Sequence, residues 1–405
     1  MLKWITENTD LSVLFSVLIL VCIGLASIYS ATIDTGSMAF FYRQLMFAGL
    51  GLLVMIAISL MPFRTLRLLS YPLYGLSVFV LMLILIIGKA VAGSKSWFGI
   101  GGFGLQPSEM VKVTTILALA AYLSERHVSP RRMKDVLIVF GIVLLPVALI
   151  ILQPDMGTAI IYIGILLFVL YWAGASTFLI LSLVVPGIAA IASLFGTAAF
   201  VAVVAATLLI LFILRENRLM SAIIFSITVL VGASVQFIFG KLAPHQQNRI
   251  HTFLNPDSDP LGAGYNVIQS KIAIGSGGLL GKGFLQGTQT QLNFLPAQWT
   301  DFIYCVPAEE FGFLGAVVIL LLLTTLLYRG VQIASTVKSR YASIVAIGIV
   351  ATLAVHTMIN IGMSVGMMPV IGVPLPFLSY GGSSLLTNMI MVGLLLHLYT
   401  NRKEY

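Results

Sequence analysis

Charged side chains are scarce in this sequence. Only 9% of its 405 residues are Asp, Glu, Lys or Arg, against about 25% in an average soluble domain. Hydrophobic residues make up 59%. Because a side chain that faces lipid carries charge only at high cost, this composition does not fit an ordinary soluble protein. It is typical of a chain that crosses a membrane many times.

Cysteine is nearly absent, and the pattern of Cys and His indicates no metal site. The two cysteines, Cys22 and Cys305, lie in or beside apolar segments without metal-ligand spacing. A disulfide between them stays open, although buried unreactive thiols are the expectation. His356 and His397 each stand alone within an apolar segment. Single buried histidines are usually packed and hydrogen-bonded, so neither is assigned a ligand.

Long apolar runs dominate the rest of the sequence. A membrane-spanning helix needs about 20 mostly apolar residues. The sequence therefore predicts an all-α polytopic membrane protein, treated as a single domain over 1–405. The expected spans lie near 11–31, 42–61, 70–92, 107–123, 135–152, 157–173, 177–195, 198–214, 219–240, 304–328, 342–366 and 380–399.

The basic residues predict the orientation of these spans. With a cytoplasmic N-terminus, 14 of the 22 Lys and Arg fall in inside loops, as the positive-inside rule expects. We therefore expect a multi-pass protein with both termini in the cytoplasm. The net charge of +8 then belongs to the membrane surface, and no nucleic-acid partner is expected.

The acidic residues gather at the opposite face. With this orientation, eight of the 14 Asp and Glu lie at or near the outer side: Asp34, Glu109, Asp155, Asp257, Asp259, Asp301, Glu309 and Glu310. Ionisable groups at membrane depth are costly and usually functional. We therefore expect a polar cavity that opens to the outside.

Two outer loops carry most of the polarity. One covers 89–106, and Trp97 within it is either an interfacial anchor or a platform for stacking a sugar. The other covers 241–303, and a loop of that length is normally functional. Its apolar stretch 267–274 predicts a short interfacial helix, and the sequence GSGGLLGKG at 275–283 predicts a flexible turn.

Several acidic motifs admit both a structural and a functional interpretation. Glu109 and Lys112 are spaced i,i+3 and share a helix face, so they form either an internal ion pair or part of the cavity wall. Asp155, in QPDMGTA, is either a helix cap or a site residue. Asp301 and Glu309, in WTDFIYCVPAEEFGFLG, stand at the mouth of a long apolar helix, where several carboxylates favour a function.

The least ordinary stretch is NPDSDPLGAGY at 255–265. Asp-Pro and Gly-Ala-Gly make turns, but turns do not require two acidic residues. A further loop, VPLPFLSYGGSS, contains Ser379 and leads into a helix start. Backbone N–H groups at such a start can bind phosphate oxygens, although this signal is weak alone.

These motifs together resemble the SEDS family (shape, elongation, division and sporulation). The resemblance rests on SKSWFGIGGFGLQPSEMVKV, QPDMGTA, DPLGAGYNVIQSKIAIGSGGLLGKGFLQGTQTQLNFLP, TDFIYCVPAEEFGFLG and PLPFLSYGGSS, in family order over nearly the whole chain. The SKIAIGSGGLLGKG run is closer to the elongation branch than to the division branch. The sequence departs at Trp299, where the family commonly has His. It also holds three expected spans in 178–240 where the family has one, which predicts an inserted pair beyond ten core helices.

The resemblance implies a peptidoglycan glycosyltransferase that polymerises lipid II at the outer face of the bacterial cytoplasmic membrane. It implies Asp259 as the essential carboxylate, which we interpret as the general base; Asp257 in the same segment is the competing candidate. Lys112, Lys271 and Arg43 are candidates to neutralise the departing pyrophosphate. Trp97, Glu109, Asp155, Asp301, Glu309 and Ser379 are the other expected site residues.

The resemblance also implies partners and leaves other functions open. The expected partners are a class B penicillin-binding protein and other proteins of the elongation complex. Independently of the resemblance, the outer carboxylates could hold a divalent cation such as Mg²⁺ or Mn²⁺, with Asp259 and Glu109 as candidate ligands; no organic cofactor is expected. The alternative functions are a transporter that flips lipid II and a non-catalytic scaffold that activates the penicillin-binding protein.

Overall fold

The computed structural model describes residues 9–33, 36–91, 94–100, 103–214, 218–239, 241, 247, 260 and 264–402. Asp257 and Asp259 lie outside these described residues. The chain divides into two compact units, one formed by Met1–Val169 with Asn266–Tyr405 and the other by Leu170–Tyr265. The expected insertion, 178–240, falls within the second unit, and its status as an insertion stays a prediction.

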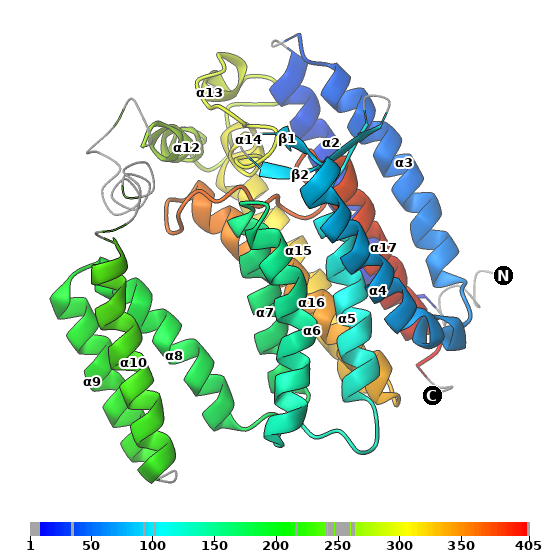
Figure 1. Ribbon diagram of the computed structural model, residues 1–405. Helices are drawn as coiled ribbons and strands as arrows, with labels where there is room; N and C mark the ends of the chain where they lie inside the picture. Colours follow the sequence, from blue (N-terminus) through cyan, green and yellow to red (C-terminus); the bar gives the residue numbers. More distant parts are fainter. Residues whose placement is uncertain are drawn as a thin grey trace. The chain divides into compact units, whose positions relative to one another are not determined.

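The first unit is a bundle of long helices (Figure 1). Along the chain these are α2 (Leu11–Ile33), α3 (Ala39–Ser59), α4 (Phe63–Ile87), α5 (Pro107–Leu123), α6 (Met133–Ile151), α7 (Met156–Trp172), α15 (Gly312–Thr336), α16 (Arg340–Ser364) and α17 (Gly382–Thr400). Helices α16 and α17 are mostly buried and form its centre. Helices α3 and α4 expose large apolar side chains such as Leu53 and Ile86, which suits contact with lipid.

The second unit consists of α8 (Thr177–Leu194), α9 (Thr197–Leu214) and α10 (Arg218–Phe239). Helix α8 packs against both α9 and α10. Ser176 begins α8 as its N-cap, because its hydroxyl accepts a hydrogen bond from the backbone N–H of Leu179 at 3.2 Å.

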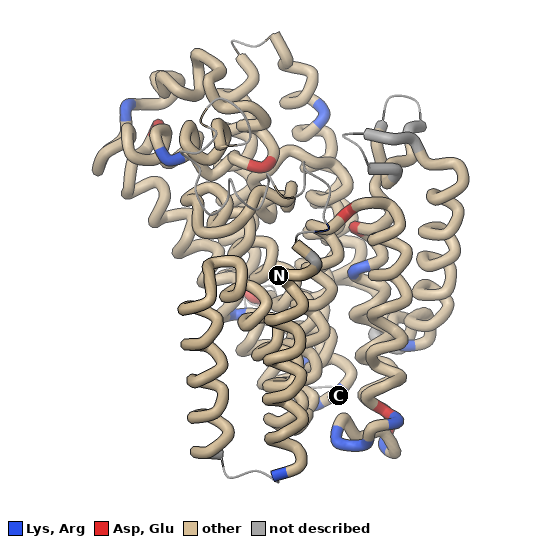
Figure 2. The backbone as a smooth tube through the Cα atoms, turned by 60° about the vertical axis from the view of Figure 1, so that its left-hand side comes forward, with Lys and Arg blue, Asp and Glu red and all other residues tan. Residues whose placement is uncertain are grey.

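Every expected span overlaps a long helix, and the all-α polytopic membrane class is confirmed. In the described part of the chain, nine helices are long and apolar enough to cross a membrane: α2, α3, α4, α6, α8, α10, α15, α16 and α17. Helices α7 and α9 are apolar but shorter, and α5 has 17 residues. Figure 2 shows that charged residues lie mainly near the ends of the long helices.

Two local expectations needed correction. The expected span 304–328 starts too early, because α14 (Cys305–Glu310) is a separate short helix. Gly312 follows it with φ +65°, a conformation that favours glycine, and there the chain turns into α15. The outer loop 89–106 contains an antiparallel sheet of β1 (Lys89–Val91), β2 (Ser94–Ile100) and β3 (Phe103–Leu105) in the order β1-β2-β3.

The cysteines are both free thiols. Cys305 is buried as expected, but Cys22 is exposed on α2, so the expectation of two buried thiols is wrong for Cys22. In an apolar span an exposed Cys is compatible with a lipid-facing position, because the thiol behaves as a small hydrophobic group.

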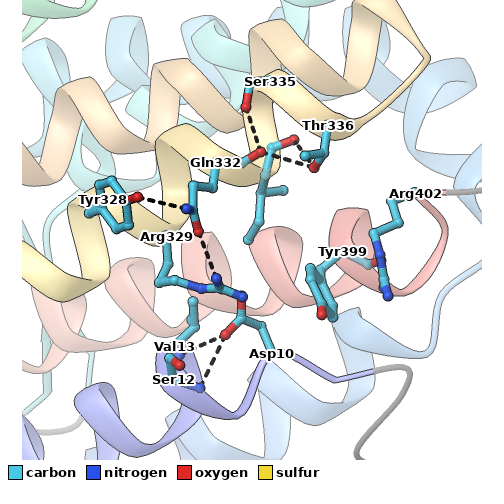
Figure 3. A network of polar contacts seen from close by, with 11 residues as sticks. Asp10, Ser12, Val13, Tyr328, Arg329, Gln332, Ser335, Thr336, Tyr399 and Arg402 are labelled. Atoms are coloured by element: carbon cyan, nitrogen blue, oxygen red, sulfur yellow. Dashed lines mark hydrogen bonds and ion pairs between the residues drawn. The ribbon is translucent and has the colours of Figure 1, made fainter.

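An ion pair with a buried carboxylate joins the start of α2 to α15 (Figure 3). Arg329 donates to one oxygen of Asp10 from Nε at 2.9 Å and from Nη2 at 2.6 Å. The Asp10 side chain is 1% exposed, and its other oxygen accepts from the backbone N–H of Ser12 at 3.1 Å and of Val13 at 3.2 Å. Asp10 therefore caps α2 and binds α15 at once.

We expect Arg329→Met to lower the stability of the protein by about 2 kcal/mol, because it leaves the buried Asp10 carboxylate without its cation. The double variant Asp10→Asn/Arg329→Met should recover most of this loss, since Asn still caps a helix and needs no counter-charge. Thermal unfolding in detergent measures both. A double variant no more stable than Arg329→Met would contradict this account.

Candidate active site

Three short helices and their loops gather at the other end of the first unit (Figure 1). They are α12 (Tyr265–Ser276), α13 (Thr288–Gln291) and α14. We call residues 264–311 together with 365–381 the loop end. Helix α12 confirms the expected short helix in the long loop, and it begins six residues after Asp259.

The Glu309 carboxylate is the centre of the loop end. Its side chain is fully buried and pairs with Lys282 Nζ at 2.7 Å. It also accepts hydrogen bonds from the backbone N–H of Gln289 at 2.9 Å, and from the N–H and hydroxyl of Thr290 at 3.1 and 2.8 Å. Longer bonds come from the hydroxyls of Thr288 and Ser276. One carboxylate therefore fixes the whole segment from 276 to 290.

Glycines allow this segment to lie directly on the backbone of α14. A Cβ atom at Gly277 would stand 2.2 Å from the carbonyl oxygen of Ala308, and one at Gly281 would stand 2.1 Å from that of Glu310. The backbone N–H groups of Lys282 and Gly283 donate to the carbonyls of Glu309 and Glu310 at 3.1 and 2.9 Å. The Gly-rich stretch expected to be a flexible turn is thus a closely packed one.

The neighbouring Glu310 has a different environment. Its Oε1 accepts from the Ser30 hydroxyl and from the backbone N–H of Leu285, while its buried Oε2 has no partner among the described residues. Burial raises the pKa of Glu310 above its ordinary value of 4.5, and the charge of Glu309 adds to this shift. Burial also opposes ionisation of Glu309, but the hydrogen bonds from Lys282, Gln289 and Thr290 outweigh it and lower the pKa of that carboxyl.

A second set of contacts clamps the turn at 299–301 to the loop before α17. The Ser379 hydroxyl donates to the carbonyl of Thr300 at 2.7 Å and accepts from the N–H of Leu375 at 2.8 Å. The N–H of Tyr380 donates to the carbonyl of Trp299 at 2.8 Å. Ser379 is therefore occupied by two backbone groups.

Trp299 and Asp301, in the same turn, have different surroundings. Trp299 stacks on Phe40 of α3, with ring centroids 5.4 Å apart, so the departure from the family pattern fills an aromatic contact. The Asp301 carboxyl lies near Gly372, with Oδ2 3.8 Å from the position of a Cβ there. Burial raises the pKa of Asp301 to about 6.

Glu109 and Lys112 form a buried ion pair inside the bundle. Lys112 Nζ lies 2.8 Å from Glu109 Oε1, and their side chains are 1% and 5% exposed. Lys112 also lies 2.8 Å from Nε2 of His356 on α16. The interpretation as an internal ion pair is therefore confirmed, with His356 as an additional member that the sequence did not indicate.

The remaining site candidates have other contacts. Asp155 caps α7 by accepting from the N–H of Thr158 at 3.1 Å, and it accepts from Gln106 at 2.9 Å. Trp97 on β2 is half-buried, with its ring against Gly104. Lys271 and Arg43 are exposed, and neither forms an ion pair with a described acidic residue.

The predicted metal site has little support from the residues that can be placed. Within the described ranges, no group of three or more His, Cys, Asp or Glu could hold a metal ion. Glu109 has one buried oxygen without a partner, but the ammonium of Lys112 already neutralises it, so Glu109 fits poorly as a ligand. The role of Asp259 in metal binding stays a prediction, and no step of the mechanism below depends on a metal.

Comparison with known proteins places this architecture in a family. The model of the FtsW/RodA/SpoVE family, described as cell cycle proteins, matches residues 9–201 and 190–404. The chain belongs to this family. Stage V sporulation protein E of Bacillus subtilis is 36% identical over 401 residues, covering 96% of each chain. Peptidoglycan glycosyltransferase MrdB of Escherichia coli is 35% identical over 402 residues, covering 99% of this chain and 96% of the relative.

Solved structures of the family share the fold. A chain from a structure titled as a peptidoglycan synthase complex that coordinates polymerisation and crosslinking matches with a TM-score of 0.75 at 30% identity, covering 98% of this chain and 99% of that one. The rod shape determining protein RodA of Thermus thermophilus matches with a TM-score of 0.63 at 26% identity, covering 98% of each chain. The chain therefore shares the helical fold of these family members.

Glu309→Gln should destabilise the loop end by about 3 kcal/mol, because a neutral amide cannot replace the charge-assisted bonds of the carboxylate. Glu310→Gln is the matched control and should change stability less, because burial raises the pKa of Glu310 and so already disfavours its charge. The Glu309 contribution is complete above pH 4.5 and is lost as the pH falls below it toward the lowered pKa. Thermal unfolding and limited proteolysis of 276–291 at pH 7 measure the difference. Equal losses in the two variants would contradict it.

Asp301→Asn should stabilise the protein at pH 8 by on the order of 2 kcal/mol and have little effect near pH 4. The reason is that the raised pKa favours the protonated carboxyl, so its contribution is complete below pH 3.8 and is lost as the pH rises through about 6. Thermal unfolding across this pH range tests the sign. A destabilised variant at pH 8 would show that the ionised carboxylate has a partner that the described contacts do not include.

Proposed function

We propose that this chain is a peptidoglycan glycosyltransferase that polymerises lipid II, a disaccharide-pentapeptide on undecaprenyl pyrophosphate. The observation that carries the proposal is the loop end, a polar and closely hydrogen-bonded assembly at one end of an apolar bundle. A substrate with a lipid tail and a sugar head needs a site where membrane helices meet polar loops. The names of full-length relatives at 34–36% identity, which include peptidoglycan glycosyltransferases, support the same reaction.

The reaction forms one bond and breaks another. A hydroxyl oxygen of the acceptor sugar attacks the anomeric carbon of the donor sugar, and the bond from that carbon to the pyrophosphate oxygen breaks. The hydroxyl proton goes to a general base, and the pyrophosphate leaves with the electron pair of the broken bond. A single displacement needs no protein nucleophile, so a positioned base and a cation for the leaving group are sufficient.

Asp259 is our candidate for the base. It lies six residues before Tyr265, where α12 begins, and α12 is fixed to the bundle. The Ser270 hydroxyl on α12 donates to the carbonyl of Ser364 at 2.9 Å, and Ala273 packs with Phe302 and Cys305. The segment that contains Asp259 therefore leads into a firmly held helix.

Lys271 and Arg43 are the better candidates for the departing pyrophosphate. Both are exposed, whereas Lys112 is buried in its pair with Glu109 and Lys282 is held by Glu309. An exposed cation can approach an anionic group without breaking an existing ion pair. This favours Lys271 and Arg43 over Lys112 among the cations named from sequence.

The proposed location and partner of the protein follow from the same reaction. We place the protein in the bacterial cytoplasmic membrane with both termini in the cytoplasm and the loop end outside, where lipid II is polymerised during cell elongation. A class B penicillin-binding protein is the proposed partner, because polymerised strands require a transpeptidase to crosslink them. The fold shared with a chain of a peptidoglycan synthase complex supports such an assembly.

Asp259→Asn should abolish polymerisation of labelled lipid II by the purified protein with its transpeptidase partner, because an amide cannot accept the hydroxyl proton. The matched control is Asp257→Asn, two residues away in the same segment, which should keep most of the activity. The measurement is glycan length on gels, with folding and complex formation checked for each variant. Equal polymer from Asp259→Asn and wild type would remove Asp259 from the mechanism. Translocation of lipid II in vesicles without any polymer would favour the transporter.

A further inference from the structure

His356 is a buried titratable residue that the proposed reaction does not use. It lies on α16 and is 1% exposed. Its Nε2 atom is 2.8 Å from Lys112 Nζ, and its Nδ1 atom is 3.0 Å from the carbonyl oxygen of Pro374. The imidazole therefore connects the buried ion pair of α5 to the loop before α17.

The chemistry of the three groups fixes where the protons lie. A lysine ammonium has protons to donate and no lone pair to accept with, so Nε2 of His356 must be the acceptor. The ring then carries its proton on Nδ1, which donates to the carbonyl of Pro374. The arrangement requires a neutral imidazole that carries its proton on Nδ1 and is hydrogen-bonded at both ring nitrogens.

This contact determines how Lys112 is held. The ammonium donates to Glu109 Oε1 and to His356 Nε2, both at 2.8 Å, and the Lys112 residue is fully buried. Removing the imidazole would take away one of these acceptors where bulk water does not reach. Leaving a buried N–H of the ammonium without an acceptor costs considerable free energy, so the Lys112 side chain would shift its position.

The next turn of α16 extends the connection. Asn360 is fully buried, and its Nδ2 atom donates to the carbonyls of Val373 at 2.8 Å and of Asp301 at 2.9 Å. His356 and Asn360 are four residues apart and so share a helix face. Together they bind consecutive carbonyls of the 373–374 segment, which Ser379 and Tyr380 in turn clamp to the turn at 299–301.

We propose that His356 is a positioning residue for the transfer reaction, which fixes the Lys112 ammonium and the 373–381 loop relative to each other. The proposal rests on the glycosyltransferase function above. It assigns His356 no contact with substrate. Its effect reaches the loop end through the backbone of Pro374 and the position of the 373–381 loop. A change at His356 should therefore lower kcat more than it changes the KM for lipid II.

The chain offers matched variants for a test. His356→Leu removes both hydrogen bonds at similar volume, whereas His356→Gln supplies an amide oxygen for Lys112 and an amide N–H for Pro374. His397→Leu is the control, because His397 is also 1% exposed and also lies near a backbone carbonyl, that of Ser59 at 3.3 Å. His397 lies in the last turn of α17, far along the helix from the loop end.

Lipid II polymerisation by each variant with the transpeptidase partner gives kcat and KM. We expect His356→Leu to lower kcat at least tenfold with KM within threefold of wild type. His356→Gln should stay within threefold in kcat, and His397→Leu should match wild type. Equal kcat for His356→Leu and His397→Leu would overturn the proposal. So would a loss in His356→Gln as large as that in His356→Leu.

A second measurement does not depend on activity. Amide hydrogen exchange of residues 373–381 should accelerate at least tenfold in His356→Leu and stay unchanged in His397→Leu. If His356→Leu does not fold, His356→Asn replaces it, because its shorter amide cannot span from Lys112 to Pro374. Unchanged exchange in the folded His356 variant overturns the positioning role. An inactive wild type with accelerated exchange in the variant would overturn the proposed function and leave the contact established.

Discussion

The ion pair between Lys282 and Glu309 is the contact on which the loop end depends. A carboxylate taken out of water is tolerated only when a cation and hydrogen-bond donors replace the lost hydration. Glu309 meets this condition because the backbone N–H groups of 289–290, the hydroxyl of Thr290 and the ammonium of Lys282 all donate to its carboxylate. These donors all lie in the loop, so the loop must adopt this conformation for the buried carboxylate to be hydrogen-bonded. The glycines at 277 and 281 then allow the chain to approach α14 closely enough to do so.

The same requirement appears at each level of the bundle. At the start of α2 Asp10 forms an ion pair with Arg329, and inside the bundle Glu109 forms one with Lys112. Both pairs join or stabilise helices that are otherwise held by apolar packing, which has little directional preference. The Asp10–Arg329 pair therefore specifies how α2 meets α15, whereas the Glu109–Lys112 pair keeps its two charges paired within α5.

Local sequence patterns predicted the helices and offered one of these pairs as one of two interpretations. Apolar runs of about 20 residues indicate membrane-spanning helices. The i,i+3 spacing places Glu109 and Lys112 on one helix face. The pairing of Lys282 with Glu309 could not be predicted, because 27 residues separate them and no periodicity connects a Gly-rich turn to a distant helix. The contact between Lys112 and His356 joins positions 244 residues apart. The break at Gly312 was missed because apolar residues flank it on both sides, in the 302–308 stretch and from Phe313 onward.

The adjacent carboxylates of α14 have a consequence for how the loop end responds to acid. The pKa of Glu310 lies above 4.5 and that of Glu309 lies below it, although the two are neighbours in sequence. On acidification Asp301 and Glu310 therefore discharge first, and Glu309 is the last to do so. As the pH falls, the carboxylate that holds the loop together is thus the last of these three to lose its charge.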